Sequence, residues 1–174
     1  MFILISGSSK SGKSSYAEGR LESFSDSLKI YIAVSRVTDD EMKERVRLHQ
    51  ERRKYKGFIT VECECDLGDV NIPEGASIMI ESLTAWTANE MFRGECVYDS
   101  DYVIGKIHSE LETIRHKAMN VIVVADDVFS DGIEYDAMTE RYMRTLAKLA
   151  IMIASYADEV IEIFAGMPYN FKNE

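Results

Sequence analysis

The chain has 174 residues, 46% of them hydrophobic and 29% charged, which fits a single globular domain over residues 1–174 with a continuous core. Its formal net charge of −10 at pH 7 disfavours a general nucleic-acid-binding protein, because such proteins usually carry a basic surface. We expect a cytoplasmic protein, because the sequence has no apolar run near the ~20 residues that span a bilayer, no signal-peptide pattern, and an odd number of cysteines in no metal-ligand pattern.

The first predicted element is a strand at residues 2–5, and a Walker A loop, G-x-x-x-x-G-K-[ST], follows it at residues 7–14. A helical pattern at 15–23 comes next, so the loop has the strand before it and the helix after it that the motif requires. A chance match in a turn of small residues is the less favoured alternative. The residues expected to contact a nucleotide here are Gly7, Ser8, Ser9, Lys10, Ser11, Gly12, Lys13, Ser14 and Ser15.

Each part of the Walker A loop has a mechanical purpose. Gly7 and Gly12 allow backbone angles that let successive N–H groups surround phosphate oxygens. We expect Lys13 to reach the β- and γ-phosphates as a catalytic residue and Ser14 to bind Mg²⁺. The helix that starts there directs the positive end of its dipole at the anion. The loop therefore predicts binding of a nucleoside triphosphate with Mg²⁺.

A second predicted strand at 29–34 precedes residues 39–53, which have the composition of a helix with acidic residues in its first turn. Residues 43–56 contain seven basic and two acidic side chains, so this stretch is +5 in a chain whose remainder is −15. Such a charge island is most often a solvated helix face. It is also a suitable surface for phosphates.

Within this basic stretch, helical spacing brings Arg45, His49, Arg52 and Arg53 onto one face. The guanidinium groups attract polyphosphate and disfavour the protonated imidazole, which keeps a neutral nitrogen available to attack phosphorus. From the residues alone, an ordinary helical histidine and a nucleophile both remain open.

The predicted strand at 58–63 ends in Cys63, with Cys65 two residues further on. A redox or metal pair is one interpretation of this spacing. It is disfavoured because no second pair of ligands completes a metal site.

Two later predicted strands, at 77–80 and 121–125, lead directly into the acids Glu81 and Asp126. Parallel sheets with a Walker A loop usually end a neighbouring strand in a carboxylate that positions Mg²⁺ or its water, and ligands bind at this edge of open α/β sheets. We therefore expect Glu81 to be catalytic and both acids to bind the metal with Ser14. Each acid could also be a simple strand terminator.

The remaining elements are helical patterns at 82–93, 101–117 and 136–156 and a strand at 159–164. Strands and helices thus alternate along the chain. This alternation predicts an α/β fold of the P-loop NTPase class, with a mainly parallel sheet flanked by helices.

Several segments together resemble the bifunctional adenosylcobinamide kinase / adenosylcobinamide-phosphate guanylyltransferases of cobalamin biosynthesis. The Walker A loop is shared by a very large set of proteins, whereas the segments around His49 and after Glu81 are far more restricted. In chain order the segments are Ser11-Gly12-Lys13-Ser14-Ser15-Tyr16-Ala17-Glu18, Tyr31-Ile32-Ala33, Asp39-Asp40-Glu41-Met42, Arg45-Val46, His49, Arg53, Thr60-Val61-Glu62, Glu81-Ser82-Leu83-Thr84-Ala85-Trp86-Thr87-Ala88-Asn89 and Ala157-Asp158-Glu159-Val160.

The resemblance implies a homotrimer with a RecA-like sheet that acts in two steps. The enzyme would phosphorylate adenosylcobinamide with ATP or GTP, and then pass GMP to the product through a guanylylated histidine. His49 stands at the position of that histidine. The nucleotide site would then also include Arg45, Arg52, Arg53 and Glu62.

The chain departs from this family pattern in three places. The Walker A loop has Ser6-Gly7 and Lys10 where the family usually has Gly-Gly and Arg, which keeps the positive charge. The strand ending that is typically Asn-Glu-Val-Gly reads Asp-Asp-Val-Phe at 126–129, and the late helix lacks the usual Arg-Asp-x-x-Gly-x-x-Asn at 144–151. A divergent small-molecule kinase without nucleotidyl transfer, or a non-catalytic nucleotide-binding protein, are the alternative functions.

Overall fold

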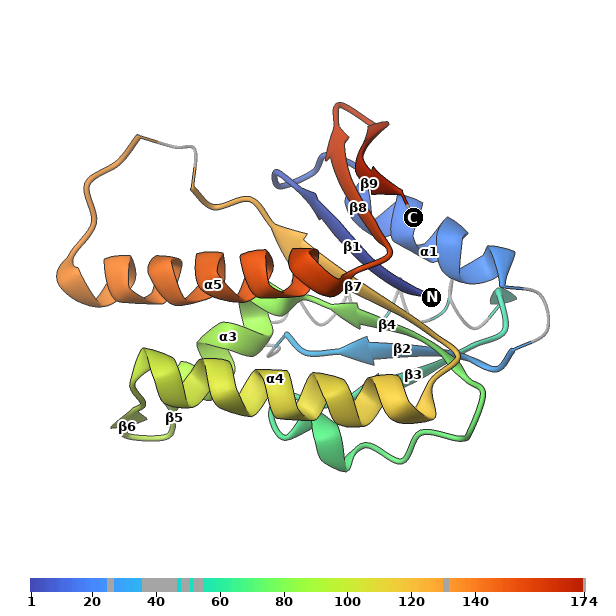
Figure 1. The fold of residues 1–174 in the computed structure, drawn as a ribbon, viewed down its shortest axis with the longest axis horizontal. Helices are drawn as coiled ribbons and strands as arrows, with labels where there is room; N and C mark the ends of the chain where they lie inside the picture. Colours follow the sequence, from blue (N-terminus) through green and yellow to red (C-terminus); the bar gives the residue numbers. More distant parts are fainter. Residues whose placement is uncertain (25–26, 36–46, 48–50, 52–54, 130–131, 174) are drawn as a thin grey trace.

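A seven-stranded sheet forms the centre of the molecule in the computed structural model (Figure 1). The structure describes residues 1–24, 27–35, 47, 51, 55–129 and 132–173. Every pair of neighbouring strands in this sheet is parallel except β8 and β9. From one edge to the other the strands are β3 (Phe58–Glu62), β2 (Lys29–Ala33), β4 (Ser77–Glu81), β7 (Asn120–Asp126), β1 (Phe2–Gly7), β8 (Glu159–Phe164) and β9 (Met167–Asn173).

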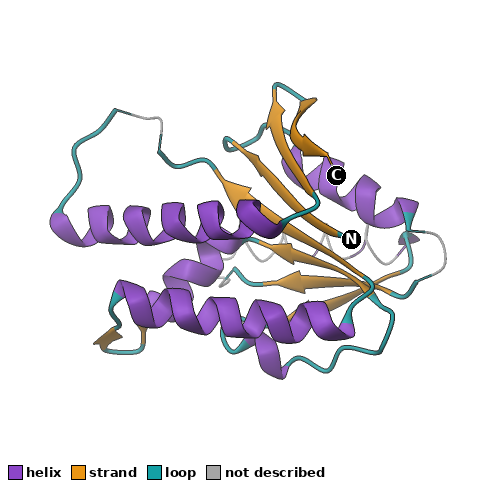
Figure 2. Ribbon diagram, viewed as in Figure 1, coloured by secondary structure: helices purple, strands orange, loops and turns teal. Residues whose placement is uncertain are grey.

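Helices cover both faces of the sheet (Figure 2). Successive strand residues point to opposite faces, so that Ile3 and Ile5 of β1 pack with α1 (Lys13–Ser23). Phe2 and Leu4 join the larger core on the other face. That core contains the buried sides of α3 (Leu83–Met91), α4 (Ser100–Lys117) and α5 (Ala137–Tyr156).

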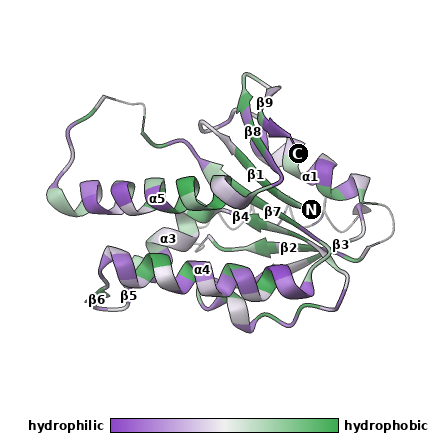
Figure 3. Cartoon of the chain, viewed as in Figure 1, coloured by the Kyte–Doolittle hydropathy of each residue, from purple (hydrophilic) through white to green (hydrophobic). Residues whose placement is uncertain are grey.

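The sequence supplies a cap where each of the three helices on that face begins. The side chains of Ser82, Asp99 and Asp136 accept backbone N–H bonds in the first turns of α3, α4 and α5, which satisfies donors that have no partner within a helix. The central strands β4, β7 and β1 are apolar on both faces, as Figure 3 shows by their colour and as parallel strands buried by helices require.

The predicted fold class is confirmed: the six predicted strands are present and the sheet is mainly parallel. The helix predicted at 82–93 is shorter, because Phe92–Arg93 form a small hairpin, β5, with β6 (Cys96–Val97). The antiparallel β9 and a 3-10 turn at Leu67–Asp69 were not predicted. The helix predicted at 39–53 lies outside the described residues, apart from residues 47 and 51.

None of the helices in the described part of the chain is both long and apolar enough to cross a membrane. The three cysteines are free thiols. Cys63 donates to the carbonyl of Cys65, and Cys65 donates to the carbonyl of Asn89. Among the described residues, neither thiol belongs to a group of possible metal ligands.

Candidate functional site: the nucleotide-binding edge of the sheet

The Walker A loop connects β1 to α1 at the carboxyl edge of the sheet. A Cβ atom on Gly7 would lie 2.6 Å from the carbonyl oxygen of Ile163, so only glycine fits there. Gly12 has φ 96°, a backbone conformation that favours glycine. The loop is anchored by the N–H of Gly166, which donates to the carbonyl of Ser11 over 2.9 Å. Both glycines of the motif are thus required by the geometry.

Lys13 is the first residue of α1, and its side chain is directed toward β7. Its Nζ lies 2.6 Å from Oδ1 of Asp126, and it donates to the carbonyl of Ser8 over 3.3 Å. Asp126 is near because the parallel register pairs Gly7 at the end of β1 with Asp126 at the end of β7. The side chain of Lys13 is only 8% exposed, so its charge is held at the base of the loop.

Ser14 and Glu81 meet one residue further along α1. The hydroxyl of Ser14 donates to Oε1 of Glu81 in a short contact, and the hydroxyl of Tyr31 donates to Oε2 over 2.6 Å. A hydroxyl and a carboxylate are oxygen ligands of the kind that Mg²⁺ prefers. This pair therefore fits the metal that the Walker A loop implies.

Asp126 is held by a different set of partners from Glu81. Besides its contact with Lys13, its backbone N–H donates to Oγ1 of Thr84 over 3.0 Å. The expected metal ligation by Asp126 stays a prediction. In this structure its carboxylate faces the lysine, while Ser14 and Glu81 face each other.

The other predicted nucleotide-binding residues are distributed unevenly. Gly7 to Ser15 all lie in the loop or in the first turn of α1. Glu62 is the last residue of β3, so it lies at the carboxyl ends of the strands, as the Walker A loop does. However, β3 is the outermost strand on one side of the sheet. Arg45, His49, Arg52 and Arg53 lie outside the described residues.

Two residues that the sequence did not single out connect the ends of β4 and β7. Thr84 lies in the first turn of α3, and its hydroxyl accepts a hydrogen bond from the backbone N–H of Asp126. Its backbone carbonyl accepts a second one, over 3.0 Å, from the hydroxyl of Tyr142 on α5. Burial and the nearby charge of Asp126 raise the pKa of Tyr142 to about 12, so this hydroxyl stays protonated at neutral pH. The signal that could have found Thr84 is its place in the restricted segment after Glu81.

A cavity of about 510 Å³ opens beside the Walker A loop, between the loop, the end of β7 and the first turns of α5. We call it the α5 cavity. It is lined by Ser8, Asp127, Val128, Tyr135, Thr139, Tyr142 and Met143.

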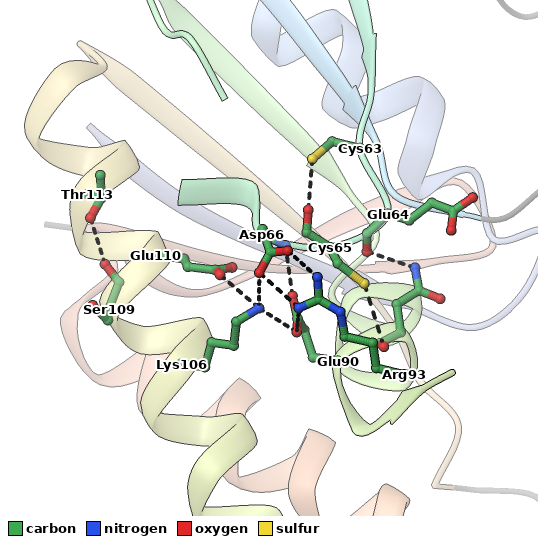
Figure 4. Close-up of polar contacts among 11 residues, drawn as sticks. Cys63, Glu64, Cys65, Asp66, Glu90, Arg93, Lys106, Ser109, Glu110 and Thr113 are labelled. Atoms are coloured by element: carbon green, nitrogen blue, oxygen red, sulfur yellow. Dashed lines mark hydrogen bonds and ion pairs between the residues drawn. The ribbon is translucent and has the colours of Figure 1, made fainter. Parts of the chain in front are cut away.

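A second group of charges lies on the α3–α4 side of the molecule (Figure 4). We call it the Lys106 cluster; its members are Asp66, Glu90, Arg93, Lys106 and Glu110. Its three carboxylates could converge on a metal ion, since their ligand atoms lie within 4.8 Å of one another. However, the ammonium group of Lys106 already occupies the centre, at 2.6, 2.5 and 3.1 Å from the three acids.

Buried charge shapes the pKa values in the Lys106 cluster. Burial alone would lower the pKa of Lys106, but hydrogen bonds to its three acids outweigh burial and raise it. Hydrogen bonds from Arg93 and Lys106 lower the pKa of Asp66 to about 2. Burial raises the pKa of Glu110. The cluster is thus a network of three acids and two cations that links the turn at Asp66 to α3 and α4.

Solved structures that share only 14% identity with this chain have the same fold. The match to the flagellar accessory protein FlaH of Methanocaldococcus jannaschii covers 99% of this chain and 78% of that protein, with a TM-score of 0.50. The match to a prototypical ATPase from the type III secretion system of pathogenic bacteria covers 92% of this chain and 50% of that protein, with a TM-score of 0.54.

Comparison of the sequence with known proteins agrees with the geometry of the site. The bifunctional adenosylcobalamin biosynthesis protein CobU of Escherichia coli K12 is 26% identical, over 99% of this chain and 100% of its own. The protein of the same description from Salmonella typhimurium LT2 is 28% identical with the same coverage. The family described as cobinamide kinase / cobinamide phosphate guanyltransferase matches residues 3–171. This match over nearly the whole chain shows that the protein belongs to the cobinamide kinase / cobinamide phosphate guanyltransferase family of transferases, as the ordered segments of its sequence predict.

Proposed function

We propose that the protein phosphorylates adenosylcobinamide with ATP or GTP and then transfers GMP to the phosphorylated product through a guanylylated His49. Family membership supports this substrate and pair of reactions. The kinase reaction is supported most directly by the convergence of Lys13, Ser14 and Glu81 at one edge of the sheet. By resemblance, we further propose a cytoplasmic homotrimer.

In the kinase step the acceptor hydroxyl attacks the terminal phosphorus, and the bond to the β–γ bridging oxygen breaks. Backbone N–H groups of the Walker A loop and the ammonium of Lys13 stabilise the charge that spreads over the phosphate oxygens. Ser14 and Glu81 would hold Mg²⁺, which neutralises the β- and γ-phosphates when bound. Tyr31 fixes the Glu81 carboxylate through its second oxygen. Direct or water-mediated ligation by Asp126 remains part of the proposal.

In the guanylyl transfer step a neutral imidazole nitrogen of His49 attacks the α-phosphorus of GTP. An N–P bond forms as the bond to pyrophosphate breaks, and the phosphate of the corrinoid then attacks the same phosphorus and releases the histidine. Arg45, Arg52 and Arg53 would neutralise the departing pyrophosphate, and Glu62 would also contact the nucleotide. This half rests on the sequence pattern and the family, because these basic residues lie outside the described part of the chain.

Labelled GTP tests the guanylyl half. Incubation with GTP labelled at the α-phosphate should leave acid-labile label on the wild-type protein, and none on His49→Ala. His116→Ala is the matched control, because His116 is exposed near the end of α4. Equal label on His49→Ala and wild type, or no label on either, would contradict the covalent intermediate.

A second candidate is a small-molecule kinase that has lost nucleotidyl transfer. The altered residues at 126–129 and 144–151 favour it. Transfer of the γ-phosphate to cobinamide without any label on the protein from the α-phosphate would support this candidate. ATP hydrolysis without transfer to cobinamide would indicate a different acceptor.

A further inference from the structure

The α5 cavity directly adjoins the Walker A loop. Ser8 of the loop forms part of its lining. The backbone N–H of Asp127, another lining residue, donates to the carbonyl of Gly7 over 2.9 Å. The volume of the α5 cavity, about 510 Å³, lies within the range of ~300–1,000 Å³ that is typical of small-molecule sites. Loop and cavity therefore form one continuous surface at the carboxyl edge of the sheet.

The cavity is on the side of the loop where a terminal phosphate would lie. A Walker A lysine binds the β- and γ-phosphates, and Lys13 points from the loop toward Asp126 at the end of β7. The α5 cavity begins at the next residue of the chain, Asp127. An acceptor in this cavity would thus approach the reacting phosphorus, rather than the base or the sugar of the nucleotide.

The lining selects for one chemical class of acceptor. Val128, Met143 and the rings of Tyr135 and Tyr142 provide apolar surface. The hydroxyl of Tyr142 is directed away to Thr84, so that this residue offers its ring. The described lining residues include the acid Asp127 but no lysine or arginine, which disfavours an anionic acceptor.

We propose that the α5 cavity binds the phosphoryl acceptor through an uncharged arm that carries the reacting hydroxyl on a short carbon chain. The assignment rests on the proposed kinase function and names the class of substrate that this site takes. A corrinoid is larger than the drug-sized ligands that such cavities enclose, so its arm enters while its ring stays outside. The hydroxyl oxygen forms the new bond to phosphorus, the nucleoside diphosphate leaves, and the hydroxyl proton passes to water.

Met143→Trp tests the assignment by filling the cavity. Ile151→Trp is the matched control, because Ile151 lies on the same helix and is 71% exposed. With adenosylcobinamide as acceptor and γ-labelled ATP or GTP as donor, Met143→Trp should raise the KM for the acceptor at least about tenfold. Binding of a fluorescent GTP analogue should stay within about twofold of wild type. Ile151→Trp should change neither quantity.

Val128→Phe fills the same cavity from the segment that follows β7, and provides a second measurement if Met143→Trp does not fold. An unchanged acceptor KM in either folded variant would overturn the assignment, as would a loss of nucleotide binding that matches the loss of transfer. If the wild-type protein binds nucleotide but transfers no phosphate to cobinamide, the proposed function fails and the assignment fails with it. Wild-type transfer together with unaffected cavity variants overturns the assignment alone.

Discussion

The Walker A site and the Lys106 cluster neutralise their lysines in different ways. Lys13 pairs with Asp126, whose side chain is 32% exposed, and otherwise contacts a loop carbonyl. Lys106 contacts three carboxylates at once, including Glu90, whose side chain is 1% exposed. The first lysine can exchange one partly exposed partner for a phosphate, whereas the second is held by three carboxylates, of which Glu90 is buried and Glu110 is 12% exposed.

The difference separates a charge that serves a ligand from a charge that serves the fold. A buried ion network is destabilising to break, because the remaining partner charges are left in a medium that solvates them poorly. A partly exposed carboxylate such as Asp126 loses less when its partner is removed, because water replaces the partner. Substitution of Lys13 should therefore lower activity with little change in stability. Substitution of Lys106 should lower stability with little change in activity.

Removal of the Lys13 ammonium should give the largest effect. We expect Lys13→Met to lower phosphoryl transfer by roughly 10²–10³-fold, the loss seen when one charge-stabilising group is removed from an active site. The free energy of unfolding should change by less than about 1 kcal/mol, because Asp126 can be solvated. Initial rates and urea unfolding measure the two quantities. The control Lys148→Met, on the exposed side of α5, should change neither quantity. If Lys13→Met lost as much stability as Lys106→Met, the contrast between the two lysines would be wrong.

Removal of the Lys106 ammonium should have the opposite outcome. Lys106→Met leaves Glu90 and its neighbours without their central cation, and we expect it to lower the free energy of unfolding by about 3 kcal/mol. Transfer activity per folded molecule should stay within about twofold of wild type. Urea unfolding and active-site titration with labelled nucleotide test this pair of expectations. The control is Lys117→Met in the last turn of the same helix, where the lysine is exposed. Loss of activity at unchanged stability would show that the Lys106 cluster serves the reaction.

The parts of the site that could be predicted depend on short spacings in the sequence. The Walker A loop is eight consecutive residues, and Glu81 follows an apolar strand directly, so local pattern is sufficient for both. The contacts of Thr84 with Asp126 and Tyr142 join residues 42 and 58 positions apart. Only the order of the strands, with β7 between β1 and β4, brings them together.

The elements that were missed lack a buried face that repeats along the sequence. In β9, Met167, Tyr169 and Phe171 do stand at every second position, but all three side chains are exposed, so this alternation marks no buried face. The Lys106 cluster draws its members from the turn at Asp66 and from residues 90–110, and each looks like an ordinary surface charge in the sequence. Burial of Glu90, a property of the packed fold, distinguishes them.

The smallest expected effect is the contribution of Asp66 to stability in acid. The pKa of Asp66 is about 2 in the folded protein against an ordinary value of 3.8, because Arg93 and Lys106 hydrogen-bond to the carboxylate. The unfolded chain therefore binds the proton more readily, so the stabilisation is fully present above pH ~4 and is lost as the pH falls from 3.8 toward about 2.

Asp66→Asn removes this dependence. Since the Asp66 side chain is 36% exposed, the wild type should be more stable than the variant by about 1 kcal/mol or less at pH 6, and this difference should shrink by pH 3. Glu110 works in the opposite sense, because its pKa is raised, chiefly by burial and to a smaller extent by the charge of Asp66. Removing that charge weakens the Glu110 contribution in the variant, so the change between the two pH values reports mainly on the Asp66 carboxylate. Urea midpoints at the two pH values measure the change. A difference that stays constant, or that grows toward pH 3, would show that the two cations do not stabilise the folded protein through the Asp66 carboxylate. The contrast between the Lys106 cluster and the Lys13–Asp126 pair would then depend on Glu90 and Glu110 alone.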